Sequence, residues 1–148
     1  MCYALYIGSE RELPVELAGD SDNDRMWLGA LERGDDRSVV GKFSKPNVYY
    51  AASWQDCGCG WLRDTMLLQR PKERERSRTL TRTCVHQLRE LIESLLVDGS
   101  SVELYFTWEG EQSQPVKRRI SMRPDEIGDD QLAMEIGDFA VVAFAPPS

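Results

Sequence analysis

The stretch TLTRTCVHQLRELIESLLV, residues 79–97, decides the fold class of this chain. Its apolar residues recur about every 3.6 positions and so share one side of an α-helix. They are Leu80, Cys84, Val85, Leu88, Leu91, Ile92, Leu95 and Leu96. Gly99 follows and favours an end to the helix there. The pattern predicts one long helix, 79–97, that packs its apolar side on the protein, with His86 on the side that faces solvent.

Five stretches outside this helix have the composition of β-strands. Residues 2–8 and 139–144 are apolar at both parities, as in strands covered on both faces. Residues 47–54 are aromatic and β-branched, which favours a strand. Residues 101–110 and 116–124 alternate between the two faces, and the EGEQSQP loop between them is of the hairpin type.

A short helix is expected over residues 24–33, where Trp27, Leu28 and Leu31 lie at helical spacing before Gly34. The length of 148 residues fits one domain. We therefore predict a single α+β domain, residues 1–148. It contains a mixed sheet of about five strands, the long helix and the short one.

Composition narrows the functional classes. The formal net charge is −7, which argues against nucleic-acid binding, since that usually needs a basic surface. No run of about 18 apolar residues is present, so no membrane partner is expected. The N-terminal residues lack the basic region and cleavage site of a signal peptide. These features predict a cytoplasmic protein, in which four cysteines serve as free thiols or ligands rather than disulfides.

One segment has the opposite charge to the rest of the chain. Six basic residues, Arg70, Lys72, Arg74, Arg76, Arg78 and Arg82, stand against Glu73 and Glu75. No apolar residue lies between Pro71 and Leu80, so we expect residues 70–78 to form a charged, mobile linker. The alternative is a docking surface for an acidic protein partner or for nucleic acid.

The local pattern with the clearest chemistry is CGCG, residues 57–60, directly after the strand 47–54. Two thiolates at this spacing could bind one soft cation such as Zn²⁺, or form a small, strained disulfide. The flanking glycines let backbone amides approach the thiols, and with Arg63 these would lower the thiol pKa. The alternative is a tight turn in which Cys57 and Cys59 pack as small apolar groups.

Cys2 joins this pair under one topology only. If the strands 2–8 and 47–54 are antiparallel neighbours, the start of the first lies beside the end of the second. Cys2 then meets Cys57 and Cys59. If they are parallel, Cys2 lies about 23 Å away. Cys84 lies within the apolar side of the long helix and belongs to the core.

Ordinary catalytic patterns are not apparent. His86 is the single histidine, which excludes a histidine-rich metal site, and no pair of Asp, Glu or Tyr residues stands out for acid–base chemistry. The sequence therefore favours a protein that is not an enzyme. Two hypotheses remain: a metal-binding or redox thiol site, and a non-catalytic interaction module in which CGCG is only a structural turn.

The N-terminal MCYALYIGS, together with a strand that ends in CGCG, resembles a group of small, uncharacterised bacterial proteins. The resemblance covers the first half of the chain best. It implies a bacterial, cytosolic origin and brings no activity, ligand or partner.

Overall fold

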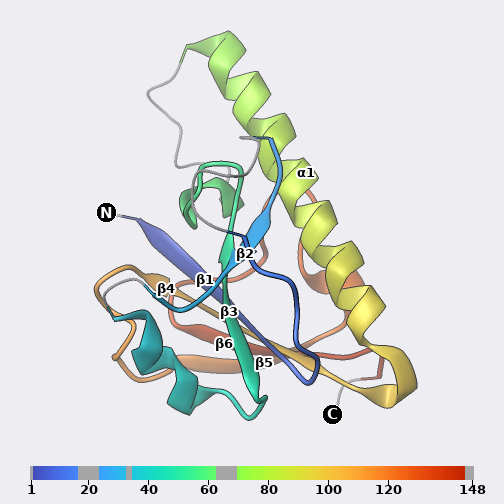
Figure 1. Cartoon of the computed structure of the whole chain (residues 1–148). Coiled ribbons are helices and arrows are strands. Elements are labelled where there is room, and N and C mark those ends of the chain that lie inside the picture. Colours follow the sequence, from blue (N-terminus) through green and yellow to red (C-terminus); the bar gives the residue numbers. More distant parts are fainter. Residues whose placement is uncertain (1, 17–23, 33–34, 63–69, 146–148) are drawn as a thin grey trace.

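The centre of the protein is a mixed sheet of six strands in the order β2-β3-β1-β4-β6-β5 (Figure 1). The computed structural model describes residues 2–16, 24–32, 35–62 and 70–145. The strands are β1 (Tyr3–Ser9), β2 (Trp27–Gly29), β3 (Asn47–Ala52), β4 (Val102–Trp108), β5 (Arg118–Met122) and β6 (Asp138–Val142). All neighbours are antiparallel except β5 and β6, which are parallel. The predicted α+β class is confirmed, with one strand more than expected.

One long helix and several short ones accompany the sheet. They are α1 (Pro71–Leu95) and the 3₁₀ helices η1 (Asp36–Lys42), η2 (Cys59–Trp61), η4 (Val97–Gly99) and η5 (Pro124–Glu126). Apolar side chains of α1 pack with Leu5 and Ile7 of β1 on one face of the sheet. Val39 of η1 packs with Ala4 and Tyr6 on the other face. Both faces of β1 are therefore covered, which is why its residues are apolar at both parities.

The apolar side of α1 matches the periodicity of its sequence. Cys84, Val85, Leu88, Ile92, Leu95 and Leu96 are buried, and Leu80 and Leu91 are half-buried. The helix ends before Gly99, whose φ of 75° closes the η4 turn. None of the helices in the described part of the chain has the length and apolar character needed to cross a membrane.

The charged segment 70–78 is not a linker, because α1 begins at Pro71 and runs through it. Proline fits the first helical position, where no amide hydrogen bond is lost. The carboxylate of Glu73 accepts a hydrogen bond from the backbone N–H of Arg70 at 3.2 Å and caps the helix start. Low apolar content therefore did not prevent helix formation. The expected mobility of this segment stays a prediction.

The prediction of a short helix over residues 24–33 is wrong. Residues Trp27–Gly29 form β2, which pairs with β3 at the edge of the sheet. The neighbours Trp27 and Leu28 are both buried because they point to opposite, covered faces of the sheet. Two adjacent apolar residues thus imitate part of a helical pattern.

The hairpin expected between 101–110 and 116–124 is also wrong, because β6 lies between β4 and β5. β6 is apolar at both parities and suits an interior position. β5 carries the exposed Arg118 and Arg119 and suits the edge, where charged residues block further strand pairing. Alternation predicts the faces of a strand but not its neighbours.

Candidate metal centre

The thiols of Cys2, Cys57 and Cys59 lie together, with all three Sγ atoms within 4.8 Å of one another. β1 and β3 are antiparallel, from Leu5 beside Ala51 to Ser9 beside Asn47. The start of β1 therefore meets the turn that follows β3, so of the two topologies that the sequence left open the protein has the one that brings Cys2 to the pair. All three residues are half-buried, and none forms a disulfide.

The separation of the sulfur atoms suits a tetrahedral site. With Zn–S bonds of about 2.3 Å, the edge of a ZnS₄ tetrahedron is about 3.8 Å. Small side-chain rotations would bring sulfurs that lie within 4.8 Å to this spacing. Among the described residues, no fourth Cys, His, Asp or Glu joins the cluster. The described residues therefore offer three ligands to one ion.

Gly58 fixes the CGCG turn against β1. Its N–H donates a hydrogen bond to the carbonyl of Tyr3 at 3.1 Å. A Cβ atom at Gly58 would lie 2.3 Å from that carbonyl oxygen, which is too close for any side chain. This contact joins Gly58, the residue between Cys57 and Cys59, to Tyr3, the residue that follows Cys2.

Ser53 organises the turn from the inside and was not singled out by its sequence. Its hydroxyl donates to the carbonyl of Cys57 at 2.7 Å and accepts from the N–H of Gly60 at 3.0 Å. Its own N–H also donates to the carbonyl of Cys57, at 2.8 Å. Ser53 is fully buried, so these bonds hold the turn without competition from water. A serine directly after an apolar strand was the available signal.

Two further contacts anchor the ends of the turn. The indole N–H of Trp27 donates to the carboxylate of Asp56 at 2.8 Å, where the backbone adopts a φ of 61°. Asp tolerates this left-handed conformation better than most residues. Trp61 is fully buried, and its indole N–H donates to the carbonyl of Ala51 at 3.0 Å. η2, which begins at Cys59, is thereby held to the end of β3.

Cys2 is held by β4. Its carbonyl accepts a hydrogen bond from the N–H of Glu109 at 2.7 Å. The adjacent Tyr3 ring stacks on Trp108 with centroids 4.2 Å apart. The approach of Cys2 to the turn is therefore set by backbone and aromatic contacts that do not involve a thiol.

Burial raises the pKa of Cys57 to about 12, even though the N–H of Cys59 donates to its sulfur at 3.4 Å. A hydrogen bond with Cys59, followed by burial, raises the pKa of Cys2 as well. The expected lowering of the thiol pKa is therefore wrong for Cys57, because desolvation outweighs the hydrogen bond from the backbone amide of Cys59. Arg63, expected to assist, lies outside the described residues. Thiols with raised pKa stay protonated at neutral pH and are poor nucleophiles.

Cys84 lies in the core, as its place on α1 predicts. It is fully buried, and burial raises the pKa of its thiol to about 12. It is not a member of the three-cysteine cluster.

The basic residues of the segment 70–82 lie on the first half of α1 and form a second surface, apart from the cysteines. Arg70, Lys72, Arg76, Arg78 and Arg82 are exposed, and Arg74 is half-buried. His86 lies one turn beyond and pairs with Asp129 at 2.8 Å. This pair, with smaller effects of Arg82 and Arg89, lowers the pKa of Asp129. Arg82, one of the basic residues of this surface, therefore acts on the carboxylate of Asp129 in the same protein.

No protein-family model, curated protein or solved structure matches this chain. The resemblance to small bacterial proteins stays a prediction.

Proposed function

We propose that the protein binds Zn²⁺ through the thiolates of Cys2, Cys57 and Cys59. The observation that carries the proposal is the approach of three Sγ atoms to within 4.8 Å of one another, from two segments far apart in the chain. The backbone of each segment is fixed by contacts of its own, so the arrangement does not depend on the thiols.

The chemistry of the donors supports a soft cation. Thiolates favour Zn²⁺ or Cu⁺ over Mg²⁺ and Ca²⁺, which prefer oxygen ligands. Three neighbouring thiolates would repel one another without a cation, in line with the raised pKa of Cys2 and Cys57. A bound dication reverses this balance, since a coordinated thiol loses its proton. The three cysteines fill three positions of a tetrahedral Zn²⁺ and leave the fourth to another ligand.

Competition against a chromophoric zinc chelator tests the proposal. Wild type should bind one Zn²⁺, and Cys2→Ser, Cys57→Ser and Cys59→Ser should each lower the affinity by about tenfold or more. Cys84→Ser, a thiol outside the cluster, is the matched control and should leave the affinity unchanged. Equal zinc binding by wild type and Cys59→Ser would refute the site.

The first half of α1 supports a second function, docking of an acidic protein partner. Among the described residues, Lys72, Arg76 and Arg78 form no ion pair with another side chain. Lys72 and Arg76, and likewise Arg78 and Arg82, are like charges at i and i+4, which destabilise a helix. Positive charge in the first turns also opposes the helix dipole. An acidic partner would relieve both effects.

Binding of fluorescent poly-L-glutamate at low salt tests this docking surface. The triple variant Lys72→Gln/Arg76→Gln/Arg78→Gln should bind at least about tenfold more weakly and keep or raise its melting temperature. The control Arg11→Gln/Arg37→Gln/Arg119→Gln has the same net charge and should bind almost as wild type does. Equal losses in both variants would mean that no specific surface exists.

A further inference from the structure

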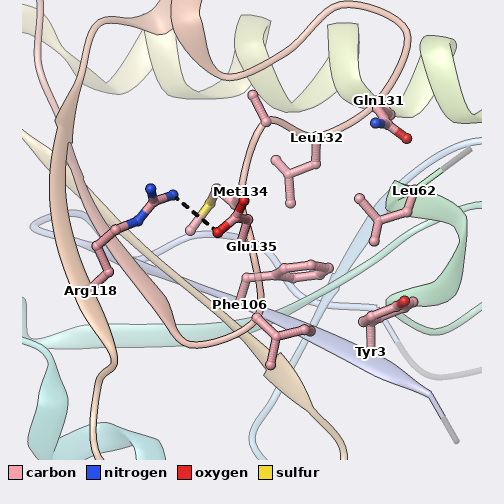
Figure 2. Close-up of a pocket in the computed structure, with 10 residues that line it drawn as sticks. Tyr3, Leu62, Phe106, Arg118, Gln131, Leu132, Met134 and Glu135 are labelled. Atoms are coloured by element: carbon pink, nitrogen blue, oxygen red, sulfur yellow. Dashed lines mark ion pairs between the residues drawn. The ribbon is translucent and has the colours of Figure 1, made fainter.

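A cavity of about 560 Å³ opens between the ends of β1 and β4 and the segment 131–136 (Figure 2). Most of the residues that line it have apolar side chains, among them Tyr3, Leu62, Phe106, Leu132 and Met134, but the larger part of its lining surface is polar. Figure 2 shows Tyr3 and Leu62 on one side of it and the charged pair of Arg118 and Glu135 on the other. The volume lies within the range of sites for small molecules, about 300–1,000 Å³.

Arg118 is held rigidly at the polar end. Its Nε and Nη2 donate to the two carboxylate oxygens of Asp138 at 2.8 and 2.6 Å. Asp138 is 1% exposed, lies beside Arg118 in the β5–β6 register, and also accepts a hydrogen bond from the N–H of Glu135. Burial opposes its ionisation, but these hydrogen bonds hold the pKa of Asp138 below its ordinary value. The guanidinium is thus positioned by a buried carboxylate.

The same hydrogen bonds leave part of the guanidinium available. The side chain of Arg118 is 53% exposed, and Nη1 has no hydrogen-bond partner in the described part of the chain. The nearest further carboxylate is that of Glu135, 3.9 Å from Nη2. The side chain of Glu135 is 82% exposed, so solvent screens this second pair and little energy is needed to displace it.

We propose that this cavity binds a small organic acid with an apolar body. Its carboxylate pairs with Arg118 and displaces Glu135, whose own carboxylate marks the position of the anion. Its apolar body lies against the half-buried side chains of Tyr3 and Leu62. A planar guanidinium suits a carboxylate because it offers two parallel N–H donors. The part of the guanidinium that Asp138 leaves available offers only N–H donors, so it can bind an anion but not a cation. These observations are independent of the thiol cluster.

Fluorescence titration with 2-naphthoate tests the proposal, with 2-naphthylmethylammonium and 2-naphthamide as the cationic and neutral counterparts. Wild type should bind the acid more tightly than either counterpart. Glu135→Gln removes the competing carboxylate and should tighten 2-naphthoate binding about three- to tenfold. Glu90→Gln removes an exposed carboxylate from α1 and is the matched control, without effect. Because Glu135 and Glu90 are both exposed, neither change should disturb the fold.

A second variant tests whether the two parallel N–H donors of the Arg118 guanidinium hold the carboxylate of the ligand. Arg118→Lys keeps a cation for the buried Asp138 but loses the bidentate geometry, so acid binding should fall at least about fivefold. Circular dichroism would verify that the variant is folded. Weaker or unchanged 2-naphthoate binding by Glu135→Gln would overturn the proposal. Tighter binding of the ammonium probe, or no binding of the acid at millimolar concentration, would do the same.

Discussion

At the residue scale, Gly58 decides whether the three thiols can meet. Its Cα lies so close to β1 that an added Cβ would stand 2.3 Å from the Tyr3 carbonyl oxygen. The backbone of β1 cannot yield, because β1 is hydrogen-bonded to β3 on one side and β4 on the other. Any side chain at position 58 would therefore move the turn, and with it Cys57 and Cys59, away from Cys2.

Gly58→Ala should lower the zinc affinity by about tenfold or more and destabilise the fold by about 1 to 3 kcal/mol. Gly41→Ala is the matched control, since a Cβ there meets no atom within 4 Å. Zinc competition and urea unfolding measure the two effects. Unchanged zinc affinity in Gly58→Ala would show that the close approach to β1 does not position the ligands.

Zinc binding should release protons, because the pKa of Cys57 is raised to about 12 and that of Cys2 is raised as well. At neutral pH these thiols hold protons that the metal must expel. The apparent affinity should therefore rise with pH below the thiol pKa, by up to about tenfold per pH unit for each proton released. A weakly buffered solution with a pH indicator measures the stoichiometry. Release of fewer than about two protons per Zn²⁺ would contradict ligation by Cys2 and Cys57 together.

At the scale of elements, the long-range contacts were the part that local patterns did not predict. The periodicity of α1 predicted its buried side because one helix presents one face to one sheet. β2 has only three residues, too few for any periodicity, and it is a strand because β3 pairs with it. The spacing of CGCG likewise indicated two thiols, whereas the third depends on the pairing of β1 with β3.

The sequence of β5 also bears on the polar end of the cavity. Arg118 shares its parity in β5 with Ile120 and Met122, which pack on the α1 side of the sheet. The side chain of Arg118 is 53% exposed, so it is the buried carboxylate of Asp138 that needs a charged partner. Arg118 fills this role only because β6 lies beside β5, a pairing that the expected hairpin did not include.

The loss of stability on truncating a side chain of α1 should follow the burial of that side chain. Leu88 is fully buried, so Leu88→Ala should destabilise the protein by about 2 to 5 kcal/mol. Leu91 is half-buried, and Leu91→Ala should cost about 1 kcal/mol. His86 makes an exposed pair with Asp129, so His86→Ala should change stability by about 0.5 kcal/mol or less. Denaturant unfolding measures all three, and a larger loss for His86→Ala than for Leu88→Ala would reverse the assignment of the buried face.

At the scale of the whole molecule, a zinc ion would link the start of β1 to the turn after β3. The unfolded chain holds these ligands far apart, so zinc binding favours the folded state. At a free zinc concentration of about 100 times Kd, the free energy of unfolding should rise by about 2.7 kcal/mol. For a chain of 148 residues this corresponds to a rise in melting temperature of roughly 5–10 °C.

Thermal unfolding of wild type, Cys59→Ser and Cys84→Ser, each with zinc and with excess chelator, tests this linkage. Wild type and Cys84→Ser should show the rise, and Cys59→Ser should not, because it lacks one ligand of the cluster. The difference between zinc and chelator within one variant removes the intrinsic effect of each substitution. An equal rise in all three variants would locate the stabilising zinc elsewhere, and no rise in wild type would mean that the three thiols do not form a zinc site in the folded protein.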